Sequence, residues 1–456
     1  MKTLVTALTV ALYLVFLSFQ PALAGAPPLQ WQKTFGGSGP DEGYSVQQTS
    51  DGGYIIAGAT WSSDTGNWDV YLVKTDPNGN SEWEKTFGPS ERDFAASVHQ
   101  TSDGGYIITG DTSSLGTGDA DVYLVKTDPN GNSQWQKNFG GTSDDHGLSV
   151  QQTSDGGYII AGYTEVYTMG NNVYLIKTDP NGNSMWQKTF GWTDSEHGFS
   201  VQQTSDGGYI IAGFIWLTFD SQSDVYLIKI DPNGILKWQK TFGANNYDFG
   251  RSVQQTTDGG YIIAGYTNSY GAGRDDVYLI KTDPNGNKKW QKTFGGSDVD
   301  DGYSVQQTSD GGYIIVGFIG GVGTSPIRGG DVYLIKTDSN GNSQWQKTFG
   351  DSSYADRGYS VKQTFDGGYI IAGSTASYGA GSNDVYLIKL CSDGTLSADF
   401  NCNGTVYYED LEVLVAQWLQ PPDILSADIY PELGDGIVNA FDFAVLANVW
   451  LQSTIP

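Results

Sequence analysis

The residues best suited to chemistry lie near the C-terminus, in the stretch DFNCNGTVYYED. Oxygen-bearing residues occupy its positions 1, 3, 5, 7 and 12: Asp399, Asn401, Asn403, Thr405 and Asp410. Gly404 stands at position 6, where such a ligand set needs a sharp turn. Alternating oxygen ligands closed by a carboxylate are the arrangement that binds Ca²⁺ in an EF-hand loop. The stretch therefore predicts a Ca²⁺ site.

A second, weaker loop follows in GDGIVNAFDF. Its residues at positions 5, 7 and 12 are Asp435, Ile437 and Asp442. Pro431 and Leu433 stand at positions 1 and 3, where they supply no side-chain oxygen. Either Asp428, through an insertion, or Glu432 would have to replace them. Binding of a second ion is left open.

Each loop leads into an apolar pattern of helical spacing, and these patterns end in the similar words LVAQWL and LANVWL. Two loop–helix units of this kind resemble a dockerin domain over residues 397–456. The resemblance implies that Ca²⁺ folds the helices, that they dock onto a cohesin-like protein, and that the chain joins a polysaccharide-degrading assembly. Asn403 replaces the usual Asp, which costs the loop one charge and some affinity. Tyr408-Glu409 and Ala440-Phe441 replace a frequent Ser-Thr pair, which argues against a standard cohesin. A metal-free helical hairpin is the alternative.

Two cysteines are present, Cys391 and Cys402, and they form no CxxC pair. This argues against a zinc or thioredoxin-type site. In an exported chain the two could form a disulfide if their Cα atoms come within about 7 Å. The bond would attach the C-terminal module to the preceding domain, and free thiols remain the alternative.

The elements before this module repeat. The Trp of a WxK motif recurs at Trp31, Trp83, Trp135, Trp186, Trp238, Trp290 and Trp345, at spacings of 52, 52, 51, 52, 52 and 55 residues. Each unit reads as four short strands: SVQQT, YIIAG, DVYLIKTD and WQKTFG. DGG and PNGN separate strands within the unit and suit hairpin turns, because glycine accepts positive φ.

The phase of the repeats distinguishes a ring from a linear solenoid. The first unit begins with a spare WxK strand, and the last unit lacks one. Together they make seven complete units, which predicts an all-β, seven-bladed β-propeller over residues 25–396, closed by its N-terminal strand. Closure of this kind resembles WD-repeat propellers. The words DPNGxxxW resemble the tryptophan-docking motif of quinoprotein propellers, which implies that the seven Trp pack between blades.

Function is expected where the units differ. The loops after YIIAG and WQKTFG open on one face and carry aromatics found in single units: Trp61, Trp68, Trp192, Trp216 and Phe219. Exposed rings suit stacking on a glycan or contact with a protein. The alternative is that they cover their own loops.

One acid per unit precedes SVQQT on this face: Asp41, Asp93, Asp145, Glu196, Asp248, Asp300 and Asp356. These acids could ring the channel mouth, or each could cap its own turn through backbone N–H groups. No Ser-His-Asp triad and no unique carboxylate pair is recognisable, so no catalytic residue is predicted.

Composition narrows the function further. The net charge of −27 argues against nucleic acid, which carboxylates repel. Residues 1–24 resemble a cleavable secretory signal, with Lys2, an apolar core and Ala22–Ala24, and a retained anchor is the alternative. No other apolar run approaches the roughly 20 residues that a membrane helix needs.

These features predict a secreted, extracellular or cell-surface, non-catalytic propeller that binds a glycan or protein. Two alternatives are kept: a glycoside hydrolase or polysaccharide lyase on a propeller scaffold, and a structural surface protein.

Overall fold

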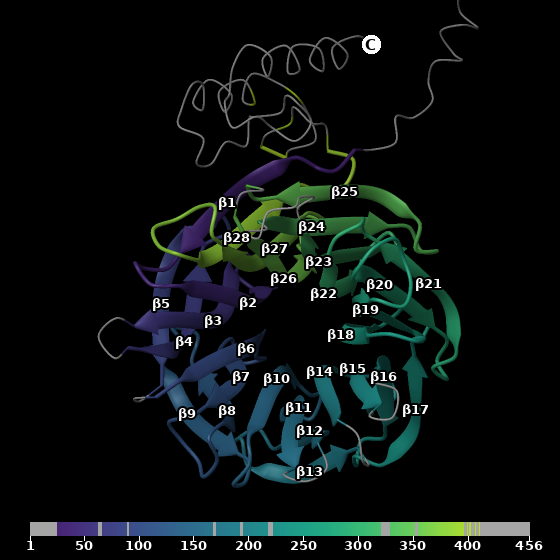
Figure 1. Ribbon diagram of the computed structural model, residues 1–456. Helices are drawn as coiled ribbons and strands as arrows, with labels where there is room; N and C mark the ends of the chain where they lie inside the picture. The colour runs from purple at the N-terminus through teal and green to yellow at the C-terminus, as the bar shows by residue number, and fades with distance from the viewer. Residues whose placement is uncertain are drawn as a thin grey trace, which may run out of the picture.

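The computed structural model describes residues 25–62, 66–88, 91–166, 170–191, 195–217, 222–320, 329–351 and 354–395, and positions 399, 401, 402, 406 and 410. Twenty-eight strands, β1 to β28, form seven four-stranded antiparallel sheets. The sheets stand around a central opening as the blades of a propeller (Figure 1). The predicted fold is therefore confirmed for this part of the chain.

In each blade the strands follow one another from the central channel outward. Blade 1 contains β2 (Asp41–Gln48), β3 (Tyr54–Ser62), β4 (Asn67–Thr75) and β5 (Ser81–Phe87). Blade 2 contains β6 (Asp93–Gln100), β7 (Tyr106–Thr112), β8 (Asp121–Thr127) and β9 (Ser133–Phe139). Blade 3 contains β10 (Asp145–Gln152), β11 (Tyr158–Val166), β12 (Gly170–Thr178) and β13 (Ser184–Phe190). Blade 4 contains β14 (Ser195–Gln203), β15 (Tyr209–Leu217), β16 (Gln222–Ile230) and β17 (Leu236–Phe242).

The remaining blades follow the same plan. Blade 5 contains β18 (Asp248–Gln255), β19 (Tyr261–Thr267), β20 (Asp276–Thr282) and β21 (Lys288–Phe294). Blade 6 contains β22 (Asp300–Gln307), β23 (Tyr313–Gly320), β24 (Gly330–Thr337) and β25 (Ser343–Phe349). Blade 7 contains β26 (Asp356–Gln363), β27 (Tyr369–Thr375), β28 (Asp384–Leu390) and, as its outermost strand, β1 (Leu29–Phe35).

Strand β1 closes the ring, as predicted from the spare WxK strand at the start of the repeats and the missing one at their end. It pairs antiparallel with β28, from Leu29 opposite Leu390 to Phe35 opposite Val385. The Tyr386 hydroxyl donates to Gln32 Oε1 at 2.5 Å, the place that Gln136 takes for Tyr123 in blade 2. The N-terminal strand thus supplies the same contacts as a strand of continuous sequence.

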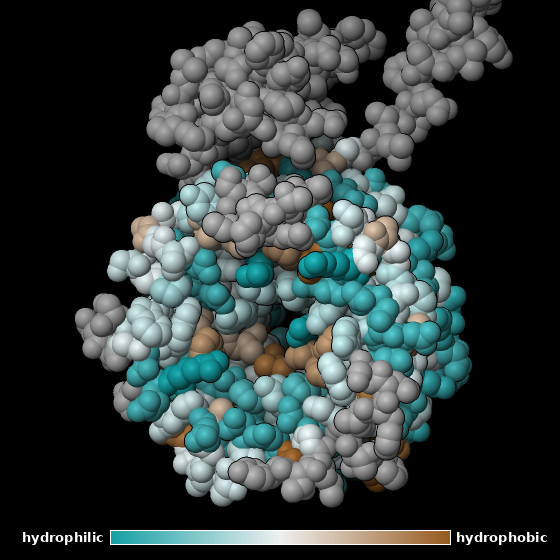
Figure 2. All heavy atoms as spheres, viewed as in Figure 1, coloured by the Kyte–Doolittle hydropathy of each residue, from teal (hydrophilic) through white to brown (hydrophobic). Residues whose placement is uncertain are grey.

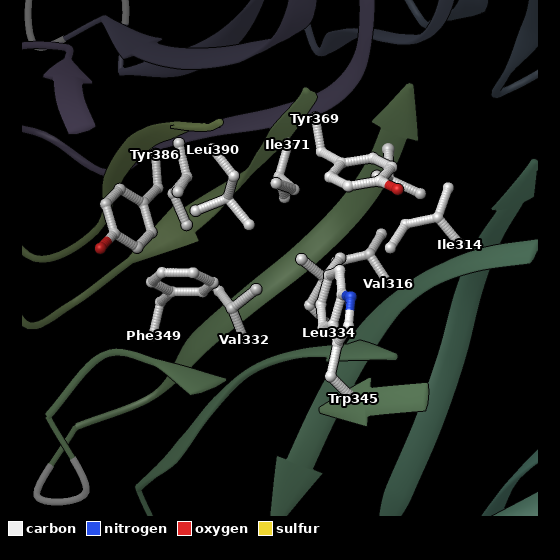
Figure 3. Close-up of a cluster of buried hydrophobic side chains, with 12 residues drawn as sticks. Ile314, Val316, Val332, Leu334, Trp345, Phe349, Tyr369, Ile371, Tyr386 and Leu390 are labelled. Atoms are coloured by element: carbon white, nitrogen blue, oxygen red, sulfur yellow. The ribbon is translucent and has the colours of Figure 1, made fainter. Parts of the chain in front are cut away.

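Apolar side chains fill the space between neighbouring blades. Figure 3 shows the interface of blades 6 and 7, where Val332, Leu334 and Phe349 meet Ile371 and Tyr386. Both faces of strands such as DVYLIK are apolar because each face meets a different blade. The core is therefore seven similar interfaces rather than one centre.

The seven WxK tryptophans pack between blades, as predicted. Trp83 of blade 1 lies edge-on to Tyr106 of blade 2, with ring centroids 5.9 Å apart. The other six Trp make equivalent contacts with the Tyr of the next blade at 5.8–6.1 Å. Gly131 has φ +75°, and a β-carbon there would lie 2.7 Å from the Trp83 ring. The Asn-Gly turn therefore needs glycine for its backbone and for docking of this Trp.

Side chains of the SVQQT motif join the innermost strands. The Ser45 hydroxyl accepts the Val98 backbone N–H of the next blade at 3.2 Å, and all seven blades repeat this bond. Gln47 Oε1 accepts the Gln100 N–H at 2.7 Å. Gln100 Oε1 in turn accepts the Ser50 N–H at 2.8 Å. The motif therefore satisfies backbone donors at an edge that no strand covers.

The predicted signal at residues 1–24 and most of the predicted C-terminal module lie outside the described residues. Within the described part of the chain, no helix has the length and apolar character required to span a membrane.

We expect deletion of residues 25–37 to open the ring. Blade 7 would lose its outermost strand and the docking Trp31, and β28 would present an unpaired edge. The melting temperature should fall by on the order of 10 °C, or the protein should aggregate. Calorimetry and light scattering would measure both effects. Melting at the full-length temperature would contradict closure by β1.

Candidate functional site

Every innermost strand carries a β-bulge. In β2, Gly43 pairs with Gly58 and Ser45 with Ala57, so Tyr44 has no cross-strand partner. The seven bulge residues are Tyr44, Ala96, Leu148, Phe199, Arg251, Tyr303 and Tyr359. A bulge turns its extra residue out of the regular alternation of a strand. These side chains therefore face the channel near the start of each innermost strand.

Glycine makes the bulge possible. A β-carbon on Gly58 would lie 1.8 Å from the carbonyl oxygen of Glu42. A β-carbon on Gly43 would lie 2.8 Å from Val385 of the neighbouring blade. The small residue two positions after each repeated acid is therefore required by close packing of blades.

We call the bulge residues, together with the residues two positions before them, the channel mouth. Those preceding residues are Glu42, Phe94, His146, His197, Phe249, Asp301 and Arg357. Figure 2 shows the ring hollowed at its centre, with hydrophobic and hydrophilic residues around the opening. The loop between β1 and β2 and the loop between β3 and β4 open on the side where β2 begins. The mouth therefore lies on the predicted variable face.

One side of the mouth is a continuous aromatic belt. Ring contacts run in the order His146, Tyr163, His197, Phe214, Phe249 and Tyr266, with centroids 3.9–4.7 Å apart. Strand β7 contributes Asp111, whose Oδ1 lies 3.4 Å from His146 Nδ1. The belt crosses from blade 3 to blade 5, so no single repeat could encode it.

Cations gather at the mouth of this acidic protein. Arg251, Arg357 and two of the chain's three histidines belong to the mouth, and Arg92 lies beside it, over the ring of Phe94. Each guanidinium lies over an aromatic ring, with Arg251 4.2 Å from the Phe199 centroid. None of the three arginines forms an ion pair with a described residue, and Arg251 Nε is buried without a hydrogen-bond acceptor. The Asp301 carboxylate of the mouth lies within electrostatic range of Arg251 and Arg357, so it offsets part of their charge.

Two carboxylates complete the mouth. The Tyr44 hydroxyl donates to Glu42 Oε2 within blade 1. In blade 6 the Tyr303 hydroxyl donates to Asp301 Oδ2 at 3.0 Å. Tyr359 lies between them, with its ring centroid 5.2 Å from Tyr44 and 5.3 Å from Tyr303. Burial raises the pKa of Asp301.

Two of the predicted aromatics adjoin the mouth. Trp61 is 37% exposed and packs edge-on against Trp68. Trp68 stacks on Phe94, a mouth residue, at 5.5 Å. Trp216 instead stacks on Tyr247 at 5.4 Å. Among the described residues no ring contact joins the Trp61 pair to the Trp216 pair, and Trp192 and Phe219 lie outside the described residues.

In the described part of the chain, five of the seven repeated acids accept a backbone N–H from their own preceding turn, and Asp93 accepts from the Ser114 hydroxyl instead. All seven are buried. The Gly37 backbone N–H donates to Asp41 Oδ2 at 2.8 Å, and Gly141 donates in the same way to Asp145. Burial raises the pKa of both carboxyls. The open ring of carboxylates, one of the two alternatives, is therefore not what the structure favours.

The sequence held a signal for the mouth that the repeat comparison missed. In D-x-G-x-SVQQ the two x positions change in nearly every unit, while the positions around them hardly change. Variable positions inside a repeated strand, rather than in a loop, mark the lining of the channel.

The C-terminal loop is described only in part. Cys391 and Cys402 form a disulfide with Cα atoms 5.5 Å apart. Asp399 and Asp410 are fully buried, and the Asn401 backbone N–H donates to Asp410 Oδ1 at 3.3 Å. Asn403, Thr405, Asp435, Ile437 and Asp442 lie outside the described residues. Two buried carboxylates at positions 1 and 12 fit the oxygen ligands that Ca²⁺ prefers.

No three His, Cys, Asp or Glu side chains among the described residues are grouped as a metal site.

Comparisons with known proteins agree with the fold. Residues 366–400 match a family described as a domain of unknown function, DUF5122, beta-propeller. The regulatory protein FlaEY of Caulobacter vibrioides is 28% identical over 146 residues, which are 28% of this chain and 15% of FlaEY. The WD40 domain of Neurospora crassa Pan2 is 11% identical, with a TM-score of 0.50 over 80% of this chain and 97% of that domain. The likeness to Pan2 concerns the fold alone.

His197 should show an unusually low pKa. Burial first, and then the charges of Arg251 and His146, lower the pKa of His197 from 6.5 to about 4. Its neutral form therefore stabilises the fold above pH 6.5, and this contribution should disappear as the pH falls through 4. Ring-proton NMR would measure the pKa.

His197→Gln supplies the control, since an amide can still pair with Asn171. This variant should lose less stability than the wild type between pH 6.5 and 4. A His197 pKa near 6.5 in the folded protein would contradict the burial argument.

Proposed function

We propose that this protein is a secreted, non-catalytic propeller that binds a glycan or protein ligand at the channel mouth. The observation that supports this most is the convergence of side chains that differ between units. Arg92, Arg251 and Arg357 reach the mouth from blades 2, 5 and 7, each over an aromatic ring. A structural protein would have no reason to gather three cations there, where Asp301 is in electrostatic range of Arg251 and Arg357 and where burying charge costs free energy.

The chemistry of the mouth favours a flat, negatively charged ligand. Aromatic faces suit the apolar side of a sugar ring or a planar side chain. Guanidinium groups suit carboxylates, which they bind through paired hydrogen bonds. An acidic glycan meets both requirements, and Trp61 and Trp68 extend the aromatic surface beyond the mouth.

We also propose attachment to a larger extracellular assembly through the C-terminal, dockerin-like module. Asp399, Asn401, Asn403, Thr405 and Asp410 would hold one Ca²⁺, and Asp435, Ile437 and Asp442 would contribute to a second loop. When bound, Ca²⁺ neutralises the loop carboxylates and lets the helices fold onto a cohesin-like partner. The disulfide between Cys391 and Cys402 supports an oxidising compartment and fixes the module to blade 7.

A hydrolase acting on O-glycosyl bonds is the second candidate. Its specific support is Asp301, whose raised pKa suits a general acid. Glu42, hydrogen-bonded to Tyr44, would be the second carboxylate. We favour binding, because two catalytic acids must flank the glycosidic bond of a substrate. Here the ring of Tyr359 lies between Tyr44 and Tyr303, the hydrogen-bond partners of the two carboxylates.

The binding proposal predicts separable effects of three substitutions. On a ligand identified from an array of acidic and neutral glycans, Arg251→Ala should weaken binding by at least about 30-fold. Trp61→Ala should weaken it less and leave the melting temperature unchanged. Trp135→Ala should lower the melting temperature, because Trp135 packs against Tyr158. Calorimetric titration and thermal melts would measure these effects.

The exposed Lys237 supplies a control, because Lys237→Ala removes the same charge from the outermost strand of blade 4, next to the DPNG turn and away from the mouth. An equal loss of affinity in this variant would show that Arg251→Ala weakens binding only by changing the net charge of the protein. If the wild type hydrolyses a glycan and Asp301→Asn does not, the protein is an enzyme and the binding proposal is wrong.

Full-length protein should gain helix when Ca²⁺ is added to the chelated form. Asp399→Asn should abolish most of the gain, because the loop loses a ligand charge. Circular dichroism and calorimetric Ca²⁺ titration would measure folding and binding together. Asp119→Asn removes an exposed charge in the propeller and should have no effect. Equal helicity with and without Ca²⁺ would contradict the assignment of this loop.

A further inference from the structure

A second ring of side chains lines the channel, three residues beyond each bulge. Its members are Gln47, His99, Gln151, Gln202, Gln254, Gln306 and Lys362. We call it the Gln ring. It lies deeper than the mouth, toward the face with the tight DGG turns, because each innermost strand runs from the mouth to that turn.

The orientation of the five amides is fixed by the next blade. In each, Oε1 accepts a backbone N–H at 2.6–2.7 Å. A backbone N–H can only donate, so the accepting atom must be the oxygen. The amide nitrogen is left over, and it donates to no described residue. The Gln ring therefore directs donors, rather than acceptors, away from the blade interfaces.

Lys362 and His99 break the repeat at this position. Lysine has no acceptor, so the Gln48 N–H of blade 1 loses the bond that Gln47 gives to Gln100. The Lys362 ammonium has no ion-pair or hydrogen-bond partner among the described residues. His99 Nδ1 is buried and has no partner either. Two inter-blade bonds are given up at positions that five other units keep.

Lys362, Gln47 and His99 are neighbours around the ring, in blades 7, 1 and 2. Burial lowers the pKa of Lys362. Burial lowers the pKa of His99, contact with the Gln100 backbone raises it, and the charge of Lys362 lowers it, so Lys362 and His99 lie within electrostatic range across Gln47. An ammonium, an amide N–H and an imidazole thus form one arc of donors on the channel wall.

We infer that this arc binds a small oxyanion, a carboxylate or a tetrahedral anion such as sulfate. Several oxygens on one anion can accept from all three side chains at once, and the anion offsets the cost of an ammonium without a partner. The site is separate from the channel mouth, so it does not rest on the proposed function. It also gives a reason for the two departures from Gln.

The test replaces each departure by the residue of the other five blades. Lys362→Gln and His99→Gln should bind sulfate and acetate at least about tenfold more weakly than the wild type in calorimetric titrations. Binding of acetate alone would identify a carboxylate site, and binding of sulfate alone a site for tetrahedral anions. Lys237→Gln removes an exposed cation and should bind as the wild type does.

Thermal stability gives an independent readout. In chloride, without an oxyanion, Lys362→Gln should melt above the wild type, because it restores an inter-blade hydrogen bond and removes an ammonium without a partner. Sulfate stabilises most folded proteins because it is excluded from their surface. The quantity to compare is therefore the rise in melting temperature on adding sulfate, which should be larger for the wild type than for Lys362→Gln. Oxyanion binding as tight in Lys362→Gln as in the wild type would overturn the inference. A lower melting temperature of this variant in chloride would overturn it as well, since Lys362 would then be structural.

Discussion

The structure depends on the unpaired inner edge of seven sheets. Each innermost strand exposes backbone N–H groups to the channel, where no further strand can cover them. The side chains of Ser45, Gln47 and Gln48 and their equivalents accept most of these N–H groups from the neighbouring blades. A single bond of this type contributes about 1 kcal/mol, but the circle closes only if every blade holds the same register. The repeated motif is therefore a consequence of the ring.

This constraint separates residues that hold the ring from residues that are free to differ. Ser45 and Gln47 are tied to the next blade, whereas the bulge residue Tyr44 has no cross-strand partner. Bulge positions can therefore hold Tyr, Ala, Leu, Phe or Arg without disturbing the edge. Positions that can contact a ligand and positions that hold neighbouring blades together therefore alternate along one strand. The mouth can differ from blade to blade while the ring stays regular.

Much of the fold followed from the sequence because it depends on local and periodic signals. The spare strand at Trp31 and its absence after Leu390 were enough to predict closure, and DPNGxxxW was enough to predict Trp docking. The mouth was missed because a bulge depends on a two-against-one register that no single strand encodes. Contacts such as Asp111 with His146 join different blades, so periodicity carries no trace of them. Trp61 and Trp68 could be predicted because no other unit has Trp at these positions. The stacking of Trp68 on Phe94 could be seen only in the structure.

The two positions that depart from the Gln ring differ in kind from the variable bulge residues. A change at Tyr44 costs no inter-blade bond, so variation there needs little explanation. A Lys at position 362 forfeits an acceptor and places a charge among amide donors. Natural proteins break a local rule chiefly where function compensates for the loss. The departures at His99 and Lys362 also lie on either side of one intact Gln, whereas independent drift would have no reason to place them around a common neighbour. Cost and placement together make this arc, rather than the more variable mouth, the part of the channel whose sequence most requires a ligand to explain it.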